Sequence, residues 1–246
     1  MRTESQRRLR ISLRILCFFV ASTALTRLAA AQNPEMQQKL AEIKEAVARN
    51  RQALARYTWV EQVTISVKGE QKKQEHFQVR LGPDGKPQRA SLDLPPPSSS
   101  DSGGGRRGRL KEHVVEKKKE EYKEYADQIK SLIQQYVPPE RDMLQQAYQQ
   151  GNIMMGPAAG APGEYRLVIS NYIKRGDNMT LVIDRAQRDL VSLSIATYLD
   201  DPKDAANVSV QFAGIPGGPN HVSAETINGV SKQLTIAIQN SNYQHF

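Results

Sequence analysis

The segment TWVEQVTISVK, residues 58–68, places an apolar side chain at nearly every second position. Trp59, Val63, Ile65 and Val67 therefore share one face of an extended strand, because successive strand side chains point to opposite sides. This period of two replaces a period near 3.6 in the residues just before it. The change predicts that a helix ends here and that a strand with one buried face begins.

The preceding residues, 34–57, have the pattern of an amphipathic helix. Asn33 and Pro34 supply a cap and a first-turn proline. Five apolar side chains follow at spacings of three, four or seven: Met36, Leu40, Ile43, Val47 and Leu54. This stripe predicts packing against the protein's own core, in preference to binding a partner helix.

Two further strands follow with short connections. Phe77, Val79 and Leu81 alternate, and GPDG at residues 82–85 is a strong turn signal. A third alternating set consists of Ala90, Leu92 and Leu94. The region therefore predicts a three-stranded antiparallel meander.

Residues 95–109 differ from everything around them. Eleven of these fifteen residues are Pro, Ser or Gly, and three are arginines. Such a composition does not build a packed core, so we expect a disordered, solvated loop. Its arginines could alternatively touch an anionic surface.

A helical pair follows the loop. Residues 110–136 carry a helical stripe, and VPP at residues 137–139 ends this helix and starts a second, which runs to about Gln150. The first half of the long helix holds five Lys and five Glu between residues 111 and 124, which predicts a solvated, salt-bridged surface. The stripe consists of Leu110, Val114, Tyr122, Tyr125, Ile129, Leu132 and Tyr136.

After a Gly/Pro/Ala loop at residues 151–163, the chain has strand patterns only. Alternating apolar sets recur at 165–169, 179–183, 191–195, 208–212, 222–226 and 234–238. Val222, Ala224 and Thr226 lead into Asn228-Gly229, which is the strongest short hairpin signal in the chain. Serial strands without intervening helices are mainly antiparallel.

These patterns predict an α+β fold. We expect one large curved, mainly antiparallel sheet of about nine strands, in which the N-terminal strands join the C-terminal ones. The N-terminal helix and the inserted helical pair should cover it. Residues 32–246 would then form a single domain.

The first 31 residues have the three parts of a secretory signal peptide. Five arginines precede residue 15, residues 15–25 are apolar, and Ala29-Ala30-Ala31 offers a small-residue cleavage site. The apolar stretch is too short to span a hydrocarbon core of ~30 Å. We expect cleavage near Ala31-Gln32, in preference to an uncleaved anchor, and a periplasmic or secreted protein without a stable membrane span.

Removing this segment changes the bulk composition. The chain has 34 Lys and Arg against 26 Asp and Glu; residues 1–31 hold six arginines and one glutamate, which leaves 28 against 25. The basic excess is therefore mostly the signal's, and nucleic-acid binding is not expected. Cys17, the only cysteine, is removed as well, so we expect no disulfide and no thiol chemistry.

The sequence contains no convincing catalytic or metal-binding motif. The four histidines are far apart and lack ligand spacing. Asp200, Asp201 and Asp204 could hold Ca²⁺, but a strand-ending turn explains them better because Pro202 and Lys203 interrupt them. Arg-Gly-Asp at residues 175–177 matches a cell-adhesion tripeptide and is more simply a turn. We expect no enzyme activity, cofactor or metal.

The order of elements resembles the periplasmic lipoprotein-carrier fold, which includes the outer-membrane lipoprotein carrier and its receptor. Five short motifs are similar to those of a set of uncharacterised exported bacterial proteins: YTWVEQ at 57–62, GPDGK at 82–86, YVPP at 136–139, YLDDP at 198–202 and NSNY at 240–243. The carrier resemblance implies a curved sheet whose concave face, covered by helices, holds acyl chains.

We therefore expect a non-enzymatic binding protein that holds a lipid or another apolar ligand, such as a lipoprotein acyl chain, between sheet and helices. The expected pocket-lining residues are Trp59, Val63, Ile65, Phe77, Val79, Leu181 and Ile183. The alternative is a cell-envelope structural or protein-interaction module with a filled core, which would bind an envelope protein partner.

Overall fold

We describe the protein from a computed structural model, which covers residues 38, 45, 48–93, 106–137 and 139–246. The predicted signal peptide, residues 95–105 of the predicted loop and most of the predicted N-terminal helix lie outside the described residues. Residues 40–246 form one compact unit, and the description below concerns that unit alone.

The described elements are ten strands, the long helix α2 and the short helix α3, with a further helical segment at residues 48–54. In chain order they are β1 (Tyr57–Val67), β2 (Glu70–Leu81), β3 (Pro87–Ser91), α2 (Arg106–Ile133), α3 (Arg141–Gln149), β4 (Ile153–Pro157), β5 (Glu164–Ser170), β6 (Asn178–Asp184), β7 (Leu190–Tyr198), β8 (Ala205–Gly214), β9 (Asn220–Gly229) and β10 (Leu234–His245).

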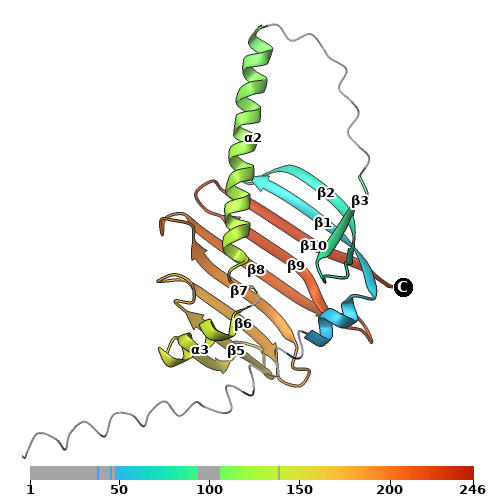
Figure 1. Ribbon diagram of the computed structural model, residues 1–246, viewed down its shortest axis with the longest axis vertical. Helices are drawn as coiled ribbons and strands as arrows, with labels where there is room; N and C mark the ends of the chain where they lie inside the picture. The colour runs from blue at the N-terminus through green and yellow to red at the C-terminus, as the bar shows by residue number, and fades with distance from the viewer. Residues whose placement is uncertain (1–37, 39–44, 46–47, 94–105, 138) are drawn as a thin grey trace, which may run out of the picture. The chain divides into compact units, whose positions relative to one another are not determined.

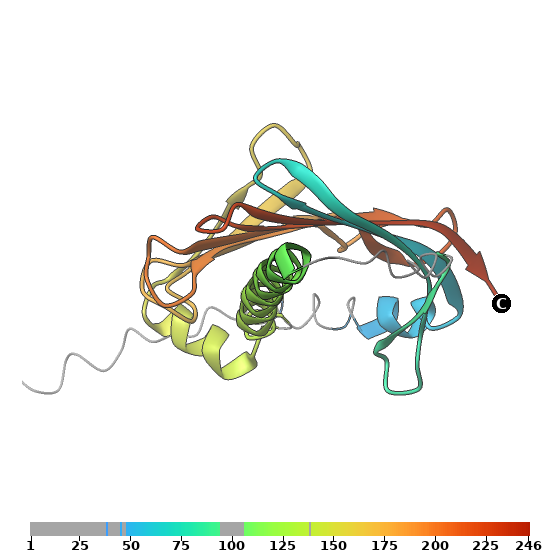
Figure 2. The ribbon, with the colours of Figure 1, turned by 90° about the horizontal axis from the view of Figure 1, so that it is seen from above.

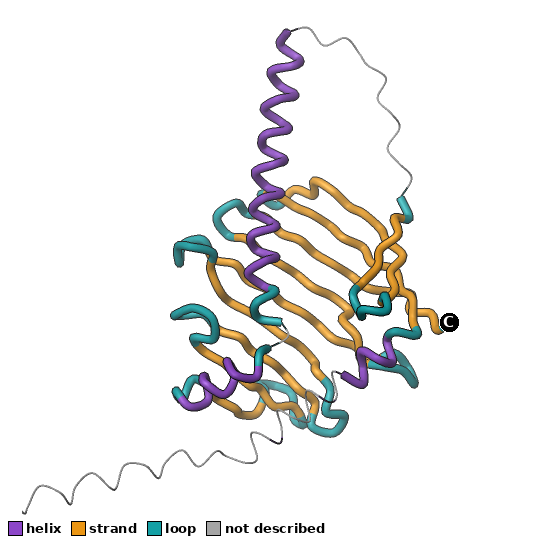
Figure 3. Tube along the Cα trace, in the orientation of Figure 1, coloured by secondary structure: helices purple, strands orange, loops and turns teal. Residues whose placement is uncertain are grey.

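All ten strands form one open antiparallel sheet in the order β3-β2-β1-β10-β9-β8-β7-β6-β5-β4 (Figures 1 and 3). The chain's two strand groups join where β1 pairs with β10 along nearly the full length of both strands. The predicted α+β class, the antiparallel sheet and the joining of N- and C-terminal strands are confirmed. The predicted strand number was short by one.

The additional strand is β4, which lies inside the stretch predicted to be a Gly/Pro/Ala loop. All five of its residues, Ile153 to Pro157, pair with β5, and Gly156 and Pro157 form its end. Proline is compatible with a strand only where its missing N–H faces outward, and β4 is an edge strand. The loop composition therefore hid a short edge strand.

The predicted hairpin turn at Asn228-Gly229 is wrong. Asn228 pairs with Thr235 and Gly229 pairs with Leu234, so both residues belong to the ladder. The chain turns at residues 230–233 instead, and Gln233 has a φ of 48°. Gly229 instead lies in close contact with side chains of helix α2.

The helices lie on the concave face of the curved sheet (Figure 2). Helix α2 begins at Arg106, four residues before its predicted start, so the last part of the predicted 95–109 loop is helical. The charged N-terminal half of α2 runs beyond the ends of the strands in Figure 1. The predicted stripe is buried in the other half, at Tyr125, Ile129 and Leu132, and in the turn that follows, at Tyr136.

Gly229 lets α2 approach the sheet. Tyr125 and Ile129 pack with Ala206 and Leu234 in a buried cluster. A Cβ atom added to Gly229 would lie 2.5 Å from Cε1 of Tyr125 and 2.6 Å from Cδ1 of Ile129. Any larger residue would therefore push the helix away from the strands.

The end of α2 is fixed by a buried carboxylate in the β5–β6 turn. The side chain of Asp177 is 1% exposed and accepts a hydrogen bond of 2.6 Å from the Tyr136 hydroxyl. It also accepts backbone N–H bonds of 2.6, 2.9 and 2.7 Å from Tyr172, Ile173 and Lys174. The Arg-Gly-Asp tripeptide is therefore a structural turn whose carboxylate faces inward.

Candidate functional site: an apolar cavity between sheet and helices

A cavity of about 520 Å³ separates part of the sheet from the helices. Its volume lies within the usual range for small-molecule sites. Apolar side chains of four neighbouring strands form the floor: Leu181, Ile183, Leu190, Leu193, Ile195, Val208, Val210, Phe212 and Val222. Leu54, Ile133, Val137 and Pro139 line it from the helical side.

Strand register explains why the floor is continuous. Leu181 of β6 pairs with Leu193 of β7, and Leu193 pairs with Val210 of β8. Directly opposed residues point to the same side of an antiparallel sheet, with Cβ atoms about 5 Å apart. The three side chains therefore form one apolar band under the cavity.

Polar contacts hold the 48–54 helical segment at the cavity. The Asn50 amide donates to Asp189 at 3.1 Å, and its carbonyl accepts the backbone N–H of Asn220 at 3.2 Å. Arg51 donates to the backbone carbonyls of Asp84 and Gly85 in the β2–β3 turn. Leu54, which belongs to the predicted apolar stripe of the N-terminal helix, thereby lines the cavity. The other residues of that stripe lie outside the described residues.

Two of the seven predicted pocket residues, Leu181 and Ile183, line this cavity. Strand alternation and register place the other five on the same concave face, but toward β1 and β2. Ile65 packs against the cluster under α2, and Val79 is fully buried. The remaining three predicted residues, Trp59, Val63 and Phe77, also lie on β1 and β2 and are not among the residues that line the cavity. A ligand-binding role for all seven stays a prediction.

Sequence patterns missed two polar residues at one end of the cavity, Glu225 and His221 of β9. The prediction put Val222, Ala224 and Thr226 on one face, which would direct Glu225 to the other side. A β-bulge lies here, because Gln211 pairs with Ala224 whereas its neighbour Phe212 pairs with Val222. The bulge changes the phase of the strand and brings Glu225 to the cavity face.

An ion pair and two aromatic contacts surround this polar end. Arg89 of β3 donates two hydrogen bonds to the buried Glu61 of β1, one of them 3.0 Å long. Tyr243 stacks on Trp59 with ring centroids 5.6 Å apart and contacts His221 at 4.0 Å. The Tyr243 hydroxyl donates to the backbone carbonyl of Val222.

Burial and charge shift the titration of the groups at this end. Burial raises the pKa of Glu225; the negative charge of Glu61 raises it further, and Arg89 partly offsets both effects. Burial lowers the pKa of His221. Ionising Glu225 in the folded protein is therefore unfavourable relative to ionising it in water.

Replacing Glu225 by glutamine should stabilise the protein at neutral pH by ~1 kcal/mol, or about 2–4 °C in Tm. The folded-state pKa of Glu225 is raised, so wild-type stability falls as pH rises from the unfolded pKa through the folded pKa. Thermal unfolding at pH 4 and pH 7.5 measures this difference. A gain of equal size at both values would contradict the assigned cause.

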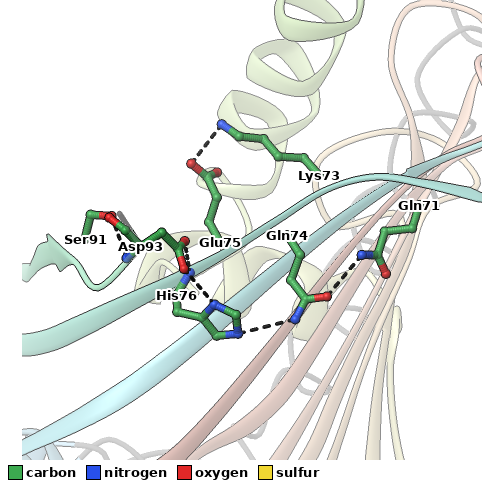
Figure 4. Close-up of polar contacts among 7 residues, drawn as sticks. All are labelled: Gln71, Lys73, Gln74, Glu75, His76, Ser91 and Asp93. Atoms are coloured by element: carbon green, nitrogen blue, oxygen red, sulfur yellow. Dashed lines mark hydrogen bonds and ion pairs between the residues drawn. The ribbon is translucent and has the colours of Figure 1, made fainter. Parts of the chain in front are cut away.

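Other candidate groups have structural roles. Asp93 accepts bonds of 2.8 Å and 3.0 Å from the backbone and ring of His76, which fasten the chain after β3 to β2 (Figure 4). These two contacts hold the pKa of Asp93 below its usual value. Asp204 accepts the Tyr125 hydroxyl at 2.7 Å, and Asp201 accepts the Lys203 N–H, as a strand-ending turn requires.

The described residues contain neither a candidate metal site nor a helix suited to span a membrane. No group of three His, Cys, Asp or Glu side chains within the described ranges could hold a metal ion. Likewise, none of the described helices is long and apolar enough to cross a membrane.

Comparison with known proteins finds no matching family model and no matching curated protein. A LolA superfamily protein from Nitrosomonas europaea is 9% identical with a TM-score of 0.36, over 85% of this chain and 93% of that one. A DUF1329 family protein from Desulfovibrio piger is 10% identical with a TM-score of 0.37, over 84% and 92%. This is the resemblance that the order of elements predicts. Likeness at this level carries no functional argument.

Proposed function

We propose that this protein is a non-enzymatic binding protein that holds the apolar chain of a lipid or lipoprotein in the cavity between its sheet and helices. The observation that carries this proposal is the cavity of about 520 Å³ with its apolar floor. An apolar concave surface that the protein leaves open indicates a site for an apolar ligand. An apolar chain matches the lining because it demands no hydrogen bonds.

The proposal includes export. The predicted signal peptide would deliver the protein to the periplasm or the exterior, where it would meet lipids and lipoproteins of the envelope. N-terminal sequencing of the protein isolated from cells tests this step. A mature N-terminus at Gln32 is the expected result, and a retained Met1 would contradict cleavage.

Replacing Leu193 by tryptophan should abolish binding without unfolding the protein. Leu193 lies in the middle of the cavity floor, and an indole there would occupy the space of a ligand. We expect the affinity for the apolar fluorophore N-phenyl-1-naphthylamine to fall by at least about tenfold. The unfolding midpoint should hold or rise, because the larger side chain fills a void.

Ser194→Trp provides the matched control. Ser194 is the next residue of β7, is exposed and points to the opposite face, so the same bulk there should leave fluorophore binding unchanged. If the core is filled, as the alternative expects, the wild type should not bind the fluorophore. Leu193→Trp should then strongly destabilise the protein. Extraction of the purified protein with organic solvent, followed by mass spectrometry, would identify a co-purifying lipid.

A further inference from the structure

One carboxyl interrupts the apolar row of paired residues that runs from β5 to β1. From β5 to β1 the pairing runs through Leu167, Leu181, Leu193, Val210, Glu225, Ile238 and Val63. Glu225 lies between Val210 and Ile238 and lines the cavity. A carboxyl placed in such surroundings costs free energy unless it is paired. A residue that served packing alone would be apolar here, like its six partners.

Charge at this end of the cavity is unbalanced. Arg89 directs both of its hydrogen bonds to Glu61. Among the described residues, none forms a hydrogen bond with the Glu225 carboxyl. Within that part of the chain, the charges that shift its pKa are those of Glu61 and Arg89. Two carboxyls therefore share one guanidinium. One additional positive charge beside Glu225 would balance the charge of the second carboxylate.

A second polar group lies at the same end. His221 is 9% exposed and lines the cavity, and a backbone hydrogen bond with Pro219 partly offsets the effect of burial on its pKa. The low pKa of His221 keeps the ring neutral, so it supplies no charge of its own. A neutral, polar ring at this position is compatible with a polar head group beside it.

We propose that this end of the cavity binds a cationic nitrogen head group, which pairs with Glu225 and lies beside His221 while the attached apolar chain occupies the floor. The inference rests on the proposed function, and it narrows the ligand class to singly cationic amphiphiles. Fatty acids and acidic lipids, whose heads would meet two carboxyls, would be disfavoured.

Three probes with the same chain test this assignment: decylamine, decanol and decanoate, each below its critical micelle concentration. Isothermal titration calorimetry at neutral pH should give decylamine an affinity at least about tenfold above that of decanol, with decanoate weakest. Glu225→Gln should remove the preference for the amine while decanol still binds. Glu75→Gln is the matched control, because Glu75 pairs with Val63 at the end of the same row but forms an ion pair with Lys73 at 2.8 Å (Figure 4).

The pH dependence gives a second readout that needs no variant. Decylamine affinity should fall as pH is lowered through the raised pKa of Glu225, whereas decanol affinity should not. The charged groups that act on Glu225 are Glu61 and Arg89. His221 lines the same cavity, and its protonation would weaken amine binding in the same direction. The other charged cavity residues are Arg51, Arg188 and Asp189. Any pH dependence that persists in Glu225→Gln comes from other groups at the cavity and not from Glu225.

The outcomes separate the two proposals. Equal affinities for amine and alcohol, a preference for decanoate, or an amine preference that survives Glu225→Gln would each overturn the head-group assignment while leaving the apolar cavity in place. If none of the three probes binds, the proposed function fails and this inference fails with it.

Discussion

Replacing Asp177 by alanine should destabilise the protein by about 3–5 kcal/mol, the largest effect expected of any single substitution. The Asp177 carboxylate is buried and accepts four hydrogen bonds, three from consecutive backbone N–H groups and one from Tyr136. Because the single Tyr136 proton goes to Asp177, the Thr197 hydroxyl, 2.7 Å away, donates to the Tyr136 oxygen. Removing the carboxylate therefore leaves a whole buried network without its acceptor.

Urea unfolding followed by circular dichroism measures this effect. Asp201→Ala is the matched control, because that exposed aspartate also serves a turn but accepts a backbone N–H of Lys203 at the surface. We expect the control to cost less than about 1 kcal/mol. A loss of that small size for Asp177→Ala would show that the network does not fasten the end of α2 to the sheet.

Most of the sheet was predictable because its strands carry one apolar face each. The alternation in residues 58–68 or 179–183 needs no tertiary information, since a half-buried strand imposes it on the sequence. The edge strand β4 was not predictable in this way. Met154 and Met155 are exposed and Gly156 and Pro157 end the strand, so its only signature is the pairing with β5.

Alternation fails where a bulge changes its phase. Val222 and Ile227 both point to the concave face, although their offset in sequence is odd and regular alternation would put them on opposite faces. That mismatch was the signal for a bulge, and it would have moved Glu225 from the solvent face to the cavity. The polar end of the site was therefore hidden in a strand whose two halves have opposite phase.

The position of the cavity was less accessible still. Strand alternation and register put all seven predicted residues on one face of the sheet, but alternation does not say which part of that face α2 would cover. That depends on where the helix docks, and Gly229 decides the docking by close contact with Tyr125 and Ile129. Ile65 and Val67 therefore pack against the buried cluster under α2. The cavity lies instead over β6 to β9.

Gly229→Val tests this docking directly and should cost about 3 kcal/mol, at the upper end of overpacking effects. The backbone of Gly229 is held on both sides by pairing with Ala206 and Leu234, so the strand has little freedom to move away. The new side chain would instead displace α2. Because Ile133 and Gln134 lie at the cavity end of this helix, the shift should also weaken N-phenyl-1-naphthylamine binding.

Gly214→Val is the control that separates this clash from the general cost of replacing a strand glycine. Gly214 ends β8, has no strained backbone angle, and an added Cβ there meets nothing within 4 Å. Urea unfolding should therefore show a loss below about 1 kcal/mol for Gly214→Val, with fluorophore binding unchanged. If the two variants lose equal stability and Gly229→Val still binds the fluorophore normally, α2 is not held by this contact, and the cavity does not owe its position to it.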